Sequence, residues 1–234
     1  MNIVVGSAFR DTPRWRAERY FDRVAALREH ARAGHSVRVV AAEGDSADNT
    51  RGLLAEEAAR CRLAVAFPEC TTGSPRFGST EEPARMRALS VVGNAIFGAV
   101  LPEDDVLVYV ENDIQWDPFT IGSLIDAALE RRDGIDIWAP MVMAGEAFYD
   151  VWAFRGLDGA RFAPFRPYHS SFGERLAAGQ PLEVSSVGSC LVMRAEVARQ
   201  VRIADGGALV DWCEQARLAG FRIAAWPAFL VQHV

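Results

Sequence analysis

The segment from Val106 to Val110 restricts the fold of this chain more than any other. Its five residues are apolar or aromatic without interruption, which is typical of a strand buried on both faces of a sheet. Glu111, Asn112 and Asp113 follow directly. In open α/β sheets ligands bind outside the carboxyl ends of the strands, where carboxylates and substrate phosphates can hold Mg²⁺ or Mn²⁺. The pattern therefore indicates a metal site at a strand end, with an ordinary polar strand end as the alternative.

Charge and composition narrow the classes of function. The chain has 234 residues, half of them hydrophobic, and no Pro-, Gly- or Ser-rich linker divides it, so we expect one domain. The net charge is −6 and the arginines are scattered, which argues against nucleic acid as a partner. All 25 basic residues are arginine, and this excludes a P-loop lysine, a Schiff-base lysine and a lysine general base.

The cysteines bear on the cellular compartment. Cys61, Cys70, Cys190 and Cys213 have neither C-x-x-C nor metal-ligand spacing, and we expect reduced, mostly buried thiols. The sequence shows no signal peptide at its start and no apolar run long enough for a transmembrane helix. We expect a cytoplasmic protein and leave open whether it associates with the inner membrane face or forms a homo-oligomer.

Strand and helix patterns alternate through the first half of the chain. This order is typical of an α/β protein with a central, mostly parallel sheet flanked by helices. Residues 145–181 are irregular and rich in aromatic residues. Strands are expected at residues 3–7, 37–42, 63–67, 106–110, 135–139, 182–193 and 222–225, and helices at 13–33 (ended by Gly34), 49–61, 86–100, 119–131, 196–202 and 209–219.

Four segments, in this order, resemble segments of glycosyltransferases with the GT-A fold. Val4–Arg10 is similar to the opening strand and its nucleotide-contacting turn, and Gly44–Thr50 to the D-G-S-x-D-x-T segment of family 2 enzymes. Glu111–Asp113 stands where that fold has its metal-binding D-x-D motif. Asp211–Ile223 is similar to the late acidic helix that ends in an A-G-[YFW]-x-[IV] strand.

This resemblance implies a single GT-A domain over residues 1–234, with a nucleotide-sugar donor half at 1–118 and an acceptor half at 119–234. The implied activity is metal-dependent transfer of a hexose from a nucleotide-diphosphate sugar to a glycan or glycoside acceptor. The implied cofactor is Mn²⁺ or Mg²⁺.

Shorter segments resemble two sub-families of that fold. Gly188–Ala195 and Pro227–His233, together with the Glu-x-Asp triplet, are similar to the Anp1-type mannosyltransferases. Phe148–Arg155 is similar to the F-Y-D-x-[FW]-x-x-R box of the Cap59-type mannosyltransferases. Both sub-families are retaining α-mannosyltransferases. The resemblance therefore implies retaining transfer with GDP-mannose as the favoured donor, while a UDP-hexose stays open.

The resemblance also implies metal ligands. Asp113 matches the direct ligand of the D-x-D motif, and Glu111 matches a ligand that binds directly or through water. His233 is expected to complete the metal shell, because many members of the fold have a His on a late strand at this place. The alternative for His233 is a solvent-exposed terminal residue.

Donor and acceptor contacts are expected at residues that match the family or lie beside its motifs. Asp45 is expected to accept hydrogen bonds from the nucleobase or ribose, with a turn carboxylate as the alternative. Arg85 or Arg87 is expected to meet the diphosphate, since arginine binds phosphate oxygens with a planar fork, and a solvated helix face is the alternative. The other donor contacts are Ala8, Phe9, Arg10 and Asn112, and the acceptor contacts are Tyr149, Trp152 and Arg155, with a packed loop as their alternative.

The late helix bears on the mechanism. Inverting family 2 enzymes have a Glu-Asp pair near its start, but Ala208 and Leu209 occupy those positions here. Asp211 and Glu214 are nearby acids outside that register, and Asp150 is a third candidate catalytic residue. A shift of one turn would restore Asp211 as a general base. Without that base, the resemblance favours a retaining mechanism in which the leaving phosphate helps to deprotonate the acceptor.

Two other functions were weighed. A sugar-phosphate nucleotidyltransferase has a related sheet, but it opens with a Gly-rich loop and a basic residue that activates the triphosphate. Gly6–Arg10 has a single glycine, and the chain has no lysine. A non-catalytic carbohydrate- or nucleotide-binding protein of the same fold is consistent with the missing base, but Glu111 and Asp113 argue against it.

Overall fold

The structure, a computed structural model, describes residues 1–31, 35–78 and 80–234. Its strands are β1 (Asn2–Phe9), β2 (Ser36–Glu43), β3 (Ala64–Ala66), β4 (Val106–Val110), β5 (Ile114–Gln115), β6 (Ile137–Ala144), β7 (Ala147–Phe148), β8 (Leu182–Val184), β9 (Cys190–Arg194) and β10 (Ile223–His233). Its helices are α1 (Arg14–His30), α2 (Thr50–Arg60), α3 (Pro83–Gly98), α4 (Pro118–Leu129), α5 (Gly173–Ala177), α6 (Ala195–Gln200) and α7 (Leu209–Leu218).

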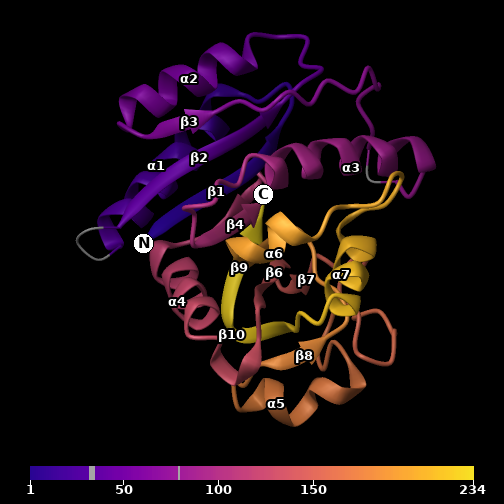
Figure 1. The fold of residues 1–234 in the computed structure, drawn as a ribbon. Helices are drawn as coiled ribbons and strands as arrows, with labels where there is room; N and C mark the ends of the chain where they lie inside the picture. The colour runs from indigo at the N-terminus through magenta and orange to yellow at the C-terminus, as the bar shows by residue number, and fades with distance from the viewer. Residues whose placement is uncertain (32–34, 79) are drawn as a thin grey trace.

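A ten-stranded sheet runs through the molecule in the order β3-β2-β1-β4-β9-β6-β10-β5, with β7 beside β6 and β8 beside β10. The strands β3, β2, β1 and β4 are parallel, as predicted. In the second half β6 and β10 are parallel, but β9 is antiparallel to both β4 and β6. The α/β class is therefore confirmed. The second half of the sheet is mixed because β9 lies between β4 and β6 and runs antiparallel to both (Figure 1).

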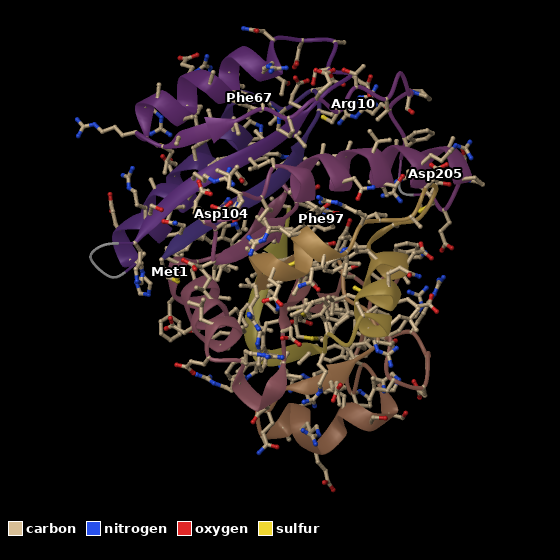
Figure 2. The ribbon with its side chains drawn as sticks, viewed as in Figure 1. Met1, Arg10, Phe67, Phe97, Asp104 and Asp205 are labelled. Carbon is tan, nitrogen blue, oxygen red and sulfur yellow. The ribbon has the colours of Figure 1, made fainter. Side chains whose placement is uncertain are left out.

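The helices divide between the two faces of the sheet. One buried cluster joins the sheet to α1, α2 and α4, and the other joins it to α3, α6, α7 and the segment 148–172. Phe97 of α3, labelled in Figure 2, contributes to the second cluster. Its ring centroid is 5.1 Å from that of Trp212 of α7. Figure 1 shows α3 and α7 on the same side of the molecule.

Most predicted elements are found within a few residues of their expected bounds, but the predicted strand 182–193 is wrong. It is two strands, β8 and β9, because the residues between them turn away from the sheet. The Ser185 N–H donates to the Arg155 carbonyl at 2.9 Å, and Ser189 has a positive φ of 35°. The predicted strand 222–225 continues to His233 as β10, with a shift in register between Trp226 and Leu230. Gly34 lies outside the described residues.

The four cysteines are free thiols, three of them buried, as predicted. Within the described part of the chain, no helix has both the length and the apolar character needed to cross a membrane.

Candidate active site

Two adjoining cavities open at the carboxyl ends of β1, β2 and β4. The N-terminal cavity, of about 320 Å³, is lined by the ends of these strands, by the loop 69–78 and by α3. The C-terminal cavity, of about 420 Å³, is lined by α3, by residues 149–153, by Gly188 and Ser189, and by the start of α7. Both cavities share a wall formed by Arg85, Leu89, Tyr109 and Glu111.

The alternation of side chains along β4 explains why Glu111 reaches this wall. Leu107 and Tyr109 face the α3 side of the sheet, whereas Val106, Val108 and Val110 face α1 and α4. Because successive side chains of a strand point to opposite faces, Glu111 follows Tyr109 onto the α3 side. The predicted buried strand thus delivers its first carboxylate directly between the two cavities.

Neighbouring strands fix the backbone of the acidic triplet. The Glu111 N–H donates to the Ser189 carbonyl at 2.8 Å, and the Val234 N–H donates to the Asp113 carbonyl at 3.0 Å. The side-chain amide of Asn112 donates to the carbonyl of Ala8. Asn112 therefore ties the end of β4 to the end of β1, at the edge of the N-terminal cavity.

The third predicted metal ligand, His233, lies beside Asp113. Its Nε2 is 3.5 Å from Asp113 Oδ2, and its ring stacks on Tyr149 with the centroids 3.8 Å apart. The pairing of β10 with β5, which sets His233 opposite Ile114, produces this arrangement. Within the residues that the structure describes, no three His, Cys, Asp or Glu side chains already converge as a metal-binding group. Asp113 and His233 are thus together, and Glu111 stands apart on the shared wall.

The electrostatics of the wall favour a bound cation. Burial, followed by the charges of Asp113 and Asp150, raises the pKa of Glu111 to about 8. The Oδ1 atom of Asp113 is buried and has no hydrogen-bond partner among the described atoms. A divalent cation beside crowded carboxylates relieves their mutual repulsion, and carboxylate oxygens are preferred ligands of Mn²⁺ and Mg²⁺. The residues present therefore fit such an ion.

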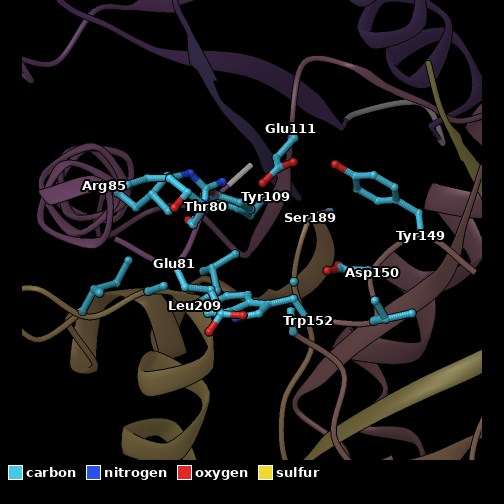
Figure 3. Close-up of a pocket in the computed structure, with 16 residues that line it drawn as sticks. Thr80, Glu81, Arg85, Tyr109, Glu111, Tyr149, Asp150, Trp152, Ser189 and Leu209 are labelled. Carbon is cyan, nitrogen blue, oxygen red and sulfur yellow. The ribbon is translucent and has the colours of Figure 1, made fainter. Parts of the chain in front are cut away.

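Asp150 is the buried acid of the C-terminal cavity. It is 7% exposed, and burial raises its pKa to about 6. Its Oδ2 has no hydrogen-bond partner among the described atoms. Figure 3 shows the carboxylates of Glu111 and Asp150 and the hydroxyl of Tyr149 pointing into the same space. A Cβ on Gly188 would lie 2.9 Å from Asp150 Oδ2, so only glycine leaves room for this carboxylate.

Two predicted nucleotide ligands hold a loop instead of standing free. Asp45 accepts hydrogen bonds from the Thr72 hydroxyl and from the backbone N–H groups of Thr72 at 2.9 Å and Gly73 at 2.8 Å. These bonds lower the pKa of Asp45, the hydroxyl of Thr72 most strongly. Arg10 donates to the carbonyls of Ser74 at 2.8 Å and Pro75 at 3.1 Å. Both side chains still line the N-terminal cavity, and through them the loop becomes one of its walls.

The structure brings together most of the predicted residues. Those lining the N-terminal cavity are Ala8, Phe9, Arg10, Asp45, Arg85, Glu111, Asn112 and Asp113, and those lining the C-terminal cavity include Tyr149, Asp150 and Trp152.

Five predicted residues line neither cavity: His233, which lies beside Asp113 as described above, and four others. Arg87 is exposed on α3. Asp211 accepts a hydrogen bond from the Ala208 N–H at 2.9 Å and so caps its own helix, and Glu214 is exposed on the same helix. Arg155 lies behind the cavity, with its guanidinium carbon 5.8 Å from the centroid of the Trp152 ring.

Several lining residues were not expected from the sequence. Thr72, Arg76 and Phe77 line the N-terminal cavity, and Glu81 and Ser189 line the C-terminal cavity. The connection from β3 to α3 has no helix or strand in its described residues 67–78 and 80–82, and long loops of this kind inside a compact domain are usually functional. That length, together with the adjacent Arg76 and Phe77, is the signal that could have identified the first group.

No protein-family model matches the sequence, and no curated protein sequence matches it either. Many solved structures do match. A mycobacterial protein aligns with all of this chain at 15% identity and a TM-score of 0.56, and the chain covers 67% of that protein. TarS (residues 1–349) of S. aureus aligns with all of it at 12% identity and a TM-score of 0.57, and the chain covers 60% of that structure.

Glucosyl-3-phosphoglycerate synthase from Mycobacterium tuberculosis aligns with all of this chain at 14% identity and a TM-score of 0.58, and the chain covers 70% of it. That structure contains Mn²⁺, UDP and phosphoglyceric acid. The synthase and TarS are glycosyltransferases of the GT-A fold. At these identities the likeness shows the fold alone, and the chain spans about three fifths of the TarS structure. The predicted GT-A fold is confirmed.

Proposed function

We propose that this protein is a metal-dependent glycosyltransferase that moves a hexose from a nucleotide-diphosphate sugar to a hydroxyl group of a glycan or glycoside. The observation that carries the proposal is the pair of adjoining cavities with Glu111 and Arg85 on their shared wall. Group transfer requires donor and acceptor to be held side by side with the reacting atoms in contact. The N-terminal cavity is the proposed donor site, and the C-terminal cavity is the proposed acceptor site.

The proposed metal site consists of Asp113 and His233, with Glu111 binding directly or through water. When bound, Mn²⁺ or Mg²⁺ supplies Lewis acidity that stabilises the negative charge of the leaving diphosphate. Arg85 and Arg76 line the donor cavity and are placed to bind phosphate oxygens. Phe9 and Phe77 line the same cavity and are the proposed contacts of the nucleobase.

The donor is proposed more narrowly from two separate sources. The Anp1-type and Cap59-type resemblance favours GDP-mannose and retaining transfer. The synthase that shares the fold was solved with UDP-glucose and Mn²⁺, which favours a UDP-hexose. We retain GDP-mannose as the first candidate and UDP-glucose as the second. Retention is favoured because Asp211 and Glu214 of α7 do not line the acceptor cavity. We place Asp150 as the catalytic carboxylate that accepts a hydrogen bond from the acceptor hydroxyl.

Calorimetric titration of GDP, UDP, GDP-mannose and UDP-glucose, each with and without Mn²⁺, tests the proposal. One nucleotide should bind only with Mn²⁺, and Asp113→Asn should weaken it at least about tenfold because a carboxylate ligand is lost. Glu174→Gln removes one negative charge from α5, outside both cavities, and should leave the affinity unchanged. If the folded protein binds none of the four, the non-catalytic binding protein becomes the better hypothesis.

The course of the reaction is tested on the product. Nuclear magnetic resonance of the anomeric proton should show the same configuration in the product as in the sugar nucleotide. An inverted product would instead identify Asp150 as a general base. The cytoplasmic location and the state of association remain predictions from the sequence.

A further inference from the structure

The charged side chains that line the C-terminal cavity are mostly acidic. Apart from Arg85 on the wall shared with the donor cavity, no arginine or histidine lines it in the described part of the chain, whereas Glu81 and Asp150 do. Arg85 also lines the donor cavity, where the diphosphate would face it. A negatively charged group deep in the C-terminal cavity would therefore meet carboxylates and no dedicated cation.

Asp150 determines which kind of ligand group can bind deep in this cavity. The residue is buried, its Oδ2 lacks a partner among the described atoms, and its carboxylate points into the cavity (Figure 3). Buried polar atoms are almost always hydrogen-bonded, and an ionised carboxylate can only accept. The Asp150 carboxylate, which lines the cavity, therefore suits a hydrogen-bond donor such as a sugar hydroxyl, and Ser189 lines the cavity beside it.

The charged residues at the rim of the cavity do not alter its preference for a group without negative charge. Glu81 pairs with Arg161 at 3.4 Å, and both side chains are exposed, so their interaction is screened by water. Arg155 approaches the Trp152 ring but does not line the cavity. The repulsion of an anion therefore comes mainly from Asp150, which is shielded from solvent, and from Glu111 on the shared wall.

The wall next to α7 is apolar. Val151, Ile203 and Leu209 line it together with the indole of Trp152. Ile203 is only 4% exposed and also packs against Gly93 of α3, so this wall is fixed by the core. An aromatic ring and aliphatic side chains of this kind suit the apolar face of a sugar ring or an apolar aglycone.

We infer that the acceptor is a hydroxylic glycoside without an anionic group, held by a hydroxyl on Asp150 and by an apolar face against Trp152, Ile203 and Leu209. The inference rests on the proposed function and narrows its acceptor. It also separates this chain from the synthase of the same fold that was solved with phosphoglyceric acid, an anionic molecule.

A matched pair of ligands tests the inference. The 4-nitrophenyl β-glucoside and the 4-nitrophenyl β-glucuronide differ only in a carboxylate that replaces the hydroxymethyl group. Each is titrated into the protein with Mn²⁺ and whichever nucleoside diphosphate binds. The glucoside should bind at least about tenfold more tightly than the glucuronide, since a buried like charge costs several kcal/mol. Saturation-transfer magnetic resonance should show contact at the aromatic protons of the aglycone.

Two variants locate the effect. Asp150→Asn keeps the shape of the side chain and removes its charge, so it should reduce the preference for the glucoside to within about threefold. Glu174→Gln should leave the preference unchanged. A glucuronide that binds as tightly as the glucoside, or a failure of both glycosides to bind to nucleotide-loaded protein, overturns the inference and leaves the proposed function standing. Glycoside binding by a protein that binds no nucleotide would instead overturn the proposed function.

Discussion

Replacing Gly188 by alanine should disturb the proposed acceptor cavity while the rest of the fold stays intact. A Cβ at this position would lie 2.6 Å from Ala153 Cβ and 2.9 Å from Asp150 Oδ2. Both separations are too short for non-bonded atoms, so Asp150 or the backbone near Ala153 must move. Overpacking of a well-packed site costs about 1–3 kcal/mol. In a chain of this size that lowers the melting temperature by roughly 2–12 °C.

A matched glycine supplies the control. In Gly98→Ala the new Cβ meets no described atom within 4 Å, and Gly98 is the last residue of α3. Alanine in a helix is more stable than glycine by up to about 1 kcal/mol, so this variant should melt at the wild-type temperature or slightly above it. Thermal unfolding followed by circular dichroism measures both variants. If Gly188→Ala melts at or above the wild-type temperature, the close approach to Asp150 is not what requires glycine here.

The same variant should act selectively on binding. Because Asp150 would be displaced, Gly188→Ala should weaken the neutral glycoside at least about tenfold. Nucleotide binding should be unchanged, since Gly188 does not line the donor cavity. Loss of both affinities would mean that the two cavities are not separable in this way.

Three further predictions concern stability and the loop. Asp104→Asn weakens the buried ion pair with Arg38, whose side chain is 19% exposed. The substitution should lower the free energy of unfolding, measured by denaturant titration, by about 1–3 kcal/mol, and an unchanged midpoint would contradict this. Because burial raises the pKa of Asp150 from 3.8 to about 6, the folded metal-free protein holds a proton that the unfolded chain releases, and stability should fall by up to about 3 kcal/mol as the pH rises through that range. Asp150→Asn should reduce this slope but not abolish it, because Glu111, whose pKa burial raises to about 8, contributes a slope of the same sign; an identical pH profile of the variant would refute the assignment. Arg10→Ala removes the bonds to the loop carbonyls, so trypsin should cleave after Arg76 several-fold faster than in the wild type, and an equal rate would show that Arg10 does not hold the loop.

The sequence was sufficient where local patterns decide the structure. The apolar run at residues 106–110 predicted β4, and the spacing of apolar residues predicted α3. The same local reasoning failed at residues 182–193, which are apolar enough for one long strand. The Ser and Gly residues at 185–189 are the local signal for a break, and the hydrogen bond of Ser185 to the distant Arg155 carbonyl, which leaves no local signal, fixes the turn.

The acids of α7 show a second limit. Asp211 and Glu214 could be placed on a helix from the sequence, but their direction depends on which face of that helix packs against the sheet. Trp212, Cys213 and Ala216 take the buried face, which leaves both acids exposed on the helix. Asp150, by contrast, lies in an irregular segment without periodicity, and only the fold shows that it is buried in the cavity.

The proposed assignment of the diphosphate ligands follows from what the other arginines already do. In a chain without lysine, the charge of a diphosphate must be met by arginine and by the metal. Arg10, the arginine nearest to the family motif, donates to two loop carbonyls, and Arg87 lies outside both cavities. Arg85 stands on the shared wall with one bond to the Thr80 carbonyl, and Arg76 is carried to the donor cavity by the loop that Arg10 holds. In this proposal Arg10 does not bind the phosphates itself but holds the loop that carries Arg76 to the donor cavity.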